Sequence, residues 1–244
     1  MANTTHGSSG RLCNCIIRSV FSSLIAEKYN LYFEYELYPE IKSLGIPLFI
    51  NGNVYHNTVI DFKDEDFHKY MYETELRSNI FVLHTYFQNP YCAKYLRDYF
   101  NKPEITNSIK THNKYNERYQ ANNDVYIHVR LGDCETRNPG FNYFNQVLEK
   151  IQFTNGYISS DSLEHPICTQ LIQKYKLKPL VMNEIDTIMF GSTCENIILS
   201  NGTFSWMIGV LGYHSTIYYP DPNLRELWHG DIFIFDDWNK VRYE

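Results

Sequence analysis

Residues 124–160 read DVYIHVRLGDCETRNPGFNYFNQVLEKIQFTNGYISS, and this stretch decides the fold. It begins with an apolar strand over 124–130, continues through a polar loop and an amphipathic helix over 141–152, and ends in a second strand over 156–160. Two strands that are joined by a crossover helix of this length run parallel to each other. The stretch therefore predicts a parallel α/β sheet.

The alternation of strands and helices continues to residue 219. Three further helices are expected, over residues 165–176, 186–194 and 203–212. Three further strands are expected, over residues 179–182, 196–200 and 215–219. Regular units of this length predict a doubly wound, nucleotide-binding domain over residues 121–244.

The first half of the chain alternates less regularly. Helices are expected over residues 12–29, 64–76 and 91–100, and strands over residues 31–36, 53–62 and 80–87. Residues 101–123 are polar and contain Pro103, so we expect a linker there and a domain boundary near residue 120. This assigns residues 1–120 to a first α/β domain.

Composition excludes some functions. The 244 residues include 22 Lys and Arg against 28 Asp and Glu, a net charge of −6, which argues against nucleic-acid binding because an acidic surface repels phosphate backbones. The sequence has no visible signal peptide and no apolar run long enough to span a bilayer. We therefore expect a soluble protein of the cytoplasm, which would be a host cytoplasm if the source is viral. Asp186, Asp236 and Asp237 have no convincing set of partner ligands, so no metal site is expected.

The first candidate site is His128-Val129-Arg130-Leu131-Gly132-Asp133. Strand alternation sends His128 and Arg130 to the same face, at the carboxyl end where open α/β sheets bind ligands. The planar guanidinium of Arg130 suits phosphate, and Asp133 can orient it or act as a carboxylate in its own right. A strand-end salt bridge is the structural alternative.

The second candidate is the sequence SNGTFSW at residues 200–206, which follows an apolar strand and opens an apolar helix. A small polar turn before a helix N-terminus can cradle an anion, and the hydroxyls of Thr203 and Ser205 add donors. Helix capping by the same residue types is the more common role.

Two further segments carry polar groups at element ends. Asp161 ends the sequence YISSD, where its carboxylate can bind a guanine edge or ribose hydroxyls, or cap a helix. Asn14 lies in GRLCNC at the start of the first helix, where it can meet an anion or a reacting sugar, or belong to a glycine-hinged helix start.

In order, GRLCN at 10–14, HVRLGD at 128–133, SSD at 159–161 and NIILSNGTFSW at 196–206 resemble the α-1,2-fucosyltransferases, which form glycosyltransferase family eleven. The H-x-R and S-x-x-F elements are also similar to those of the α-1,6- and protein O-fucosyltransferases. The resemblance extends from residue 10 to about residue 220.

The resemblance implies a GT-B architecture of two facing Rossmann-like domains, of which the first is trimmed in this short chain. It also implies inverting, metal-independent transfer of L-fucose from GDP-fucose to a glycan hydroxyl in an α-1,2 linkage, with no further cofactor. By position, Arg130 would bind the β-phosphate, Asp161 the nucleoside, and Asn14 would lie near the transferred sugar. The full set of donor contacts would be His128, Arg130, Asp161, Asn201, Thr203, Phe204 and Ser205.

Metal-free transfer requires fixed positive charge for the departing GDP, and the acceptor hydroxyl then needs only modest help from a base. Asp133 and Glu135 are both candidates for that base. The chain has Cys13-Asn14-Cys15 where the family has Gly-Asn-Gln. Two alternatives stay open: a GT-B enzyme that uses another nucleotide sugar, and a catalytically inactive glycan-binding relative.

Overall fold

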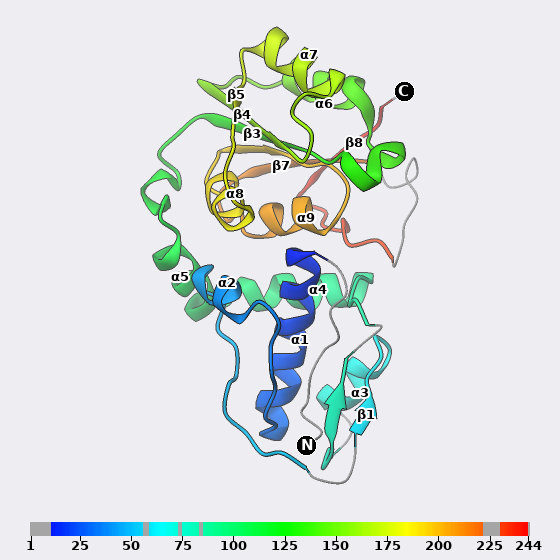
Figure 1. The fold of residues 1–244 in the computed structure, drawn as a ribbon. Coiled ribbons are helices and arrows are strands. Elements are labelled where there is room, and N and C mark those ends of the chain that lie inside the picture. Colours follow the sequence, from blue (N-terminus) through cyan, green and yellow to red (C-terminus); the bar gives the residue numbers. More distant parts are fainter. Residues whose placement is uncertain (1–10, 56–58, 73–74, 83–84, 222–229, 244) are drawn as a thin grey trace. The chain divides into compact units, whose positions relative to one another are not determined.

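The computed structural model describes residues 11–55, 59–72, 75–82, 85–221 and 230–243, and only the backbone of residues 133 and 134. The chain divides into two compact units, Met1–Gln88 and Asn89–Glu244 (Figure 1). Among the described residues, no helix is both long enough and apolar enough to cross a membrane.

The second unit is built on a parallel sheet of six strands. In chain order these are β3 (Asp124–Val129), β4 (Asn155–Ser160), β5 (Lys178–Pro179), β6 (Asn196–Ile198), β7 (Thr216–Pro220) and β8 (Asn239–Val241). Their order across the sheet is β5-β4-β3-β6-β7-β8, and all neighbours pair in parallel. Counted from β3, this is the order 3-2-1-4-5-6 of a doubly wound sheet. The predicted parallel α/β sheet is confirmed, whereas the GT-B arrangement of two facing domains stays a prediction.

Helices cover both faces of this sheet. α6 (Gly140–Leu148) and α7 (Pro166–Tyr175) lie on one face, and α8 (Glu184–Gly191) and α9 (Thr203–Val210) lie on the other (Figure 1). Each of these helices is expected from the sequence, although the structure ends α6 four residues earlier than expected. The central position of β3 follows from its composition, because all six of its residues are buried.

Alternation along β3 separates its side chains between the two faces. Val125, Ile127 and Val129 join the core formed with α6 and α7. Tyr126 faces the opposite way and packs on Gly191 of α8, where an added Cβ would lie 2.8 Å from the tyrosine ring. His128 stands two residues beyond Tyr126 and therefore shares its face.

Residues 101–123, expected as a linker, lie within the second unit. They contain α5 (Pro103–His112) and the 3-10 helix η1 (Asn116–Arg118), and they follow α4 (Pro90–Phe100). Hydrogen bonds hold this segment to the rest of the second unit: Arg118 Nε donates to Thr193 Oγ1 at 3.1 Å, and Asn113 Nδ2 donates to the Met189 carbonyl at 2.9 Å. Pro103 begins α5 rather than ending a helix, because the first turn of a helix tolerates proline. The two compact units divide after Gln88, whereas the domain boundary near residue 120 stays a prediction.

Helices form most of the regular secondary structure described in the first unit. It contains α1 (Leu12–Tyr29), α2 (Tyr38–Ser43), α3 (Asp66–Tyr72) and a two-stranded parallel sheet of β1 (Val59–Asp61) and β2 (Asn79–Phe81). The helix expected over 12–29 is confirmed, and the strands described in the regions expected over 53–62 and 80–87 are Val59–Asp61 and Asn79–Phe81. The strand expected over 31–36 is wrong. Within the described residues, the one bridge in this segment with an assigned partner joins Leu31 to Asn53. A positive φ of 54° at Leu37 turns the chain into α2.

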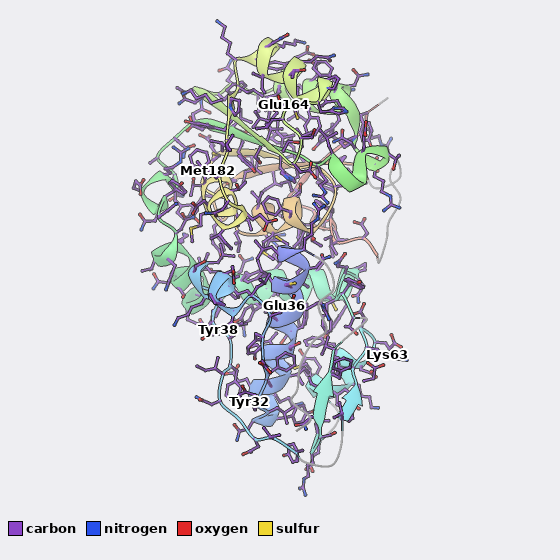
Figure 2. All side chains as sticks on the ribbon, viewed as in Figure 1. Tyr32, Glu36, Tyr38, Lys63, Glu164 and Met182 are labelled. Atoms are coloured by element: carbon purple, nitrogen blue, oxygen red, sulfur yellow. The ribbon has the colours of Figure 1, made fainter. Side chains whose placement is uncertain are left out.

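A charged side chain lies inside the first unit. Arg18 of α1 is completely buried, and its guanidinium donates to the Val82 carbonyl. The thiol of Cys15, one turn earlier, lies 3.8 Å from the carboxylate of Glu36, which is labelled in Figure 2. Burial raises the pKa of Cys15 to about 11 and lowers the pKa of Arg18. The thiol therefore stays protonated at neutral pH and is a poor nucleophile.

Candidate functional site

The candidate site lies at the carboxyl ends of β3 and β6. These two strands are neighbours, but the chain leaves β3 toward β4 and leaves β6 toward β7, on opposite sides. Such a point, where the strand order reverses, is where open α/β sheets bind ligands. Two connecting segments follow these strands: the 3-10 helix η2 (Gly132–Arg137) after β3, and the turn that leads from β6 into α9.

His128 is buried in this site, with 5% of its surface exposed. Its Nδ1 lies 2.6 Å from Ser205 Oγ, and its ring centroid lies 4.9 Å from that of Phe204. Burial and, to a smaller extent, the Arg130 charge lower the pKa of His128 to about 4, against an opposing effect of the Asp161 carboxylate. His128 is therefore neutral at pH 7, and the three side chains act on one another electrostatically.

The buried imidazole makes the second unit sensitive to acid. Because the pKa of His128 falls from 6.5 to about 4 on folding, the unfolded chain binds a proton more readily within this window. The stability that the neutral ring contributes is complete above pH 6.5 and is lost as the pH falls toward 4, a change of about 3 kcal/mol. We expect urea unfolding at pH 7, 6 and 5 to show this loss in the wild type and not in His128→Gln.

His214 provides the control for that experiment. Burial and Lys110 also lower its pKa, but its ring is exposed. His214→Gln should therefore keep most of the acid dependence. An equal loss of stability with falling pH in His128→Gln and in the wild type would contradict the assignment.

Arg130 is held at the end of β3 by an ion pair. Its Nη1 donates to Asp161 Oδ2 at 2.8 Å, and Asp161 Oδ1 accepts the Leu131 N–H at 2.9 Å. Asn138 Nδ2 donates to the Arg130 carbonyl at 2.6 Å and so fixes the backbone of the same residue. Asp161, expected as a nucleoside contact, thus binds Arg130 directly. The side chain of Asp133, the other carboxylate expected to orient Arg130, is outside the described part of the chain.

The turn before α9 lacks the cap that its sequence suggests. Gly202 occupies the N-cap position with a φ of 100°, and no side chain there accepts a hydrogen bond from the helix amides. The helix dipole places partial positive charge at this N-terminus, where it can stabilise an anion. Thr203 and Phe204 are half-buried in this first turn. Asn201 donates from Nδ2 to the Arg137 carbonyl at 2.5 Å and thereby joins the turn to η2.

Ser205 has a different environment from Thr203 and Phe204. It is completely buried, and its Oγ accepts the Ser200 N–H at 3.1 Å in addition to contacting His128. The sequence assigns Ser205 to the phosphate or the base, but the structure places its hydroxyl against the imidazole.

The remaining candidates are spread over both units. Glu135 in η2 is exposed, and its Oε1 lies 3.2 Å from His165 Nε2 at the N-cap of α7. Asn14 belongs to the first unit, where its Oδ1 accepts a hydrogen bond from Gln88 Nε2 at 3.0 Å. No cluster of three or more His, Cys, Asp or Glu side chains with the geometry of a metal site occurs in the described ranges.

Two residues of the site were missed from the sequence. Asn138 supports the Arg130 carbonyl and also accepts the Gly140 N–H at 2.8 Å, an arrangement that the turn sequence Asn-Pro-Gly could have suggested. Tyr143 of α6 donates to the Leu199 carbonyl at 2.8 Å, at the end of β6. No sequence signal identifies the second contact, because Tyr143 stands in an ordinary apolar helix face.

No protein-family model matches this sequence, and no curated protein matches it. The resemblance to the α-1,2-fucosyltransferases therefore depends on the four motifs alone, of which three contribute residues to this site.

Proposed function

We propose that the chain is an inverting, metal-independent glycosyltransferase that moves L-fucose from GDP-fucose to a hydroxyl of a glycan acceptor, in an α-1,2 linkage. The observation that carries the proposal is the position of Arg130. It is a permanently charged side chain, held by Asp161 at the carboxyl end of β3, where the strand order reverses.

The charges of this site suit a departing diphosphate. As the bond between the sugar and the β-phosphate breaks, negative charge grows on the leaving GDP and must be stabilised. The Arg130 guanidinium and the helix amides after Gly202 supply positive charge from two adjacent loops. His128 supplies a neutral ring nitrogen that needs no counter-ion.

The acceptor hydroxyl loses its proton as it attacks the anomeric carbon, and a carboxylate is the expected base. Asp133 and Glu135 both belong to η2, directly after Arg130. Glu135 is exposed and borders His165, so its carboxylate is accessible to an acceptor. The choice between the two stays open in the proposal.

Nucleotide binding and turnover test the proposal separately. Thermal-shift titrations should show stabilisation by GDP and none by an equal concentration of UDP. Release of GDP should occur with GDP-fucose, more slowly or not at all with GDP-mannose, and should persist in EDTA. Turnover of a UDP-sugar only would refute the donor, and failure to bind any nucleotide would favour the inactive glycan-binding relative.

Gly132 offers a way to disturb the Arg130–Asp161 pair without deleting either charge. Gly132 has a φ of 35°, and an added Cβ would lie 2.6 Å from Asp161 Oδ2. Gly140 has a φ of 81° with nothing within 4 Å of an added Cβ. Both Gly→Ala variants should lose about 1 kcal/mol of stability, because a side chain at positive φ is strained. Only Gly132→Ala displaces the carboxylate, so it alone should weaken GDP binding in calorimetric titrations. Equal GDP affinity in the two variants would contradict a role for the pair.

A further inference from the structure

We infer that Ser205 is a positioning residue: its hydroxyl fixes His128 in the tautomer with the proton on Nε2, so that a neutral N–H donor faces the diphosphate. The contact with the diphosphate depends on the proposed function. The tautomer itself does not, because it follows from the packing within the second unit.

The hydrogen bonds around Ser205 determine which atom donates. A serine hydroxyl has one proton and can accept two hydrogen bonds. Ser205 Oγ accepts the Ser200 N–H at 3.1 Å, since an amide can only donate. Its second contact is His128 Nδ1 at 2.6 Å. If Nδ1 carried the proton, the serine hydroxyl would accept twice, and its own proton would have no acceptor.

That arrangement is unfavourable because Ser205 is completely buried. Within the described residues its hydroxyl has no third hydrogen-bond partner. A buried hydroxyl proton without an acceptor loses its hydration with nothing in return. The hydroxyl therefore donates to Nδ1, and the ring proton resides on Nε2.

The position of Nε2 gives the tautomer its function. His128 is 5% exposed, and its only hydrogen bond within the described residues uses Nδ1. Its Nε2 has no hydrogen-bond partner there, yet it is not among the described polar atoms that are both fully buried and without a partner, so it retains some contact with solvent. Nε2 therefore lies on the narrow solvent-facing edge of the ring, at the end of β3. With its proton there, Nε2 donates to an anion, whereas in the other tautomer its lone pair would repel the anion.

A tautomer that is fixed before binding avoids a cost on binding. Phe204 limits the rotation of the imidazole from one side, with ring centroids 4.9 Å apart. Removal of the Ser205 hydroxyl frees both tautomers, and a fraction of the molecules then presents a lone pair to the diphosphate. We expect GDP affinity to fall on the order of tenfold to a hundredfold, the usual value of one hydrogen bond to a charged group.

The experiment uses the whole chain with 15N-labelled histidine, in the wild type and in Ser205→Ala, Ser205→Thr and Ser192→Ala. Long-range proton–nitrogen NMR spectra report which ring nitrogen of His128 is protonated at pH 7, and calorimetric titration reports GDP affinity. Ser192 is the matched control, because it is buried in the same unit and its hydroxyl is also hydrogen-bonded, donating to the Met189 carbonyl at 3.1 Å.

Wild type, Ser205→Thr and Ser192→Ala should all show a proton on Nε2 and equal GDP affinity, whereas Ser205→Ala should show mixed tautomers and weaker binding. A proton on Nδ1 in the wild type would overturn the inference. An unchanged tautomer in Ser205→Ala would also overturn the inference. If the wild type binds GDP, an unchanged GDP affinity in Ser205→Ala would overturn it too. If the wild type binds no GDP, the proposed function and the diphosphate contact fail together, and the spectra still decide whether Ser205 fixes the tautomer.

Discussion

Arg130→Ala should lower kcat/KM for transfer from GDP-fucose on the order of a hundredfold to a thousandfold, the usual loss when one fixed group that stabilises transition-state charge is removed. The expected loss lies mainly in kcat, because the charge on the leaving GDP is largest in the transition state. Transfer rates of purified protein at saturating and at low donor concentration provide the measurement.

The variant should remain folded. Asp161 is partly exposed and still accepts the Leu131 N–H, so it keeps hydration and one strong hydrogen bond after Arg130 is removed. Arg97→Ala is the matched control, since Arg97 also forms an ion pair with an aspartate, Asp237, in the same unit. Arg97→Ala should retain wild-type transfer. A folded Arg130→Ala protein with wild-type turnover would exclude Arg130 from the reaction.

The sequence predicts the sheet of the second unit well because apolar runs of strand length alternate with amphipathic helices from residue 124 onward. It does not predict β8, since Asn239–Val241 is a three-residue edge strand with no buried residue and no alternating pattern. The failure over 31–36 has the opposite cause. There the residues LYFEYE alternate like a strand, but most of that segment pairs with no partner strand, and its backbone is mainly irregular.

The candidate site was also predicted only in part from the sequence. His128, Arg130 and Asp161 could be grouped from the sequence, because carboxyl ends of adjacent parallel strands lie at one edge of a sheet. The direct partners could not be predicted. That Asp161 binds Arg130, and that Ser205 faces His128, depends on the packing of residues 31 and 77 positions apart in the chain.

The opposite end of β3 carries a second Arg–Asp pair, with a structural role. Asp124 is 3% exposed, and its carboxylate accepts from Arg118 Nη2 at 2.7 Å and from Asn155 Nδ2 at 2.9 Å. Arg118 also donates to Thr193 Oγ1 at 3.1 Å, and its guanidinium lies 4.4 Å from the ring centroid of Phe190. This network closes the amino end of the sheet.

Asp124→Ala should lower the free energy of unfolding by about 3–5 kcal/mol, because it leaves the Arg118 charge largely buried without its counter-ion. Urea denaturation at pH 7 measures the loss. Asp237→Ala is the control, since Asp237 is 61% exposed and its pair with Arg97 should contribute about 1 kcal/mol or less. Equal losses in the two variants would contradict the structural role of Asp124.

The same variant separates stability from function. Six strand residues place Asp124 about 20 Å from Arg130, at the rise of a β-strand. At a temperature where Asp124→Ala is still folded, it should therefore bind GDP as tightly as the wild type. An ion pair alone does not distinguish a functional arginine from a structural one. The two ends of β3 differ because Arg118 is enclosed by partners on several sides, whereas Arg130 stands at the end of the sheet where the strand order reverses and where β6 leads into α9.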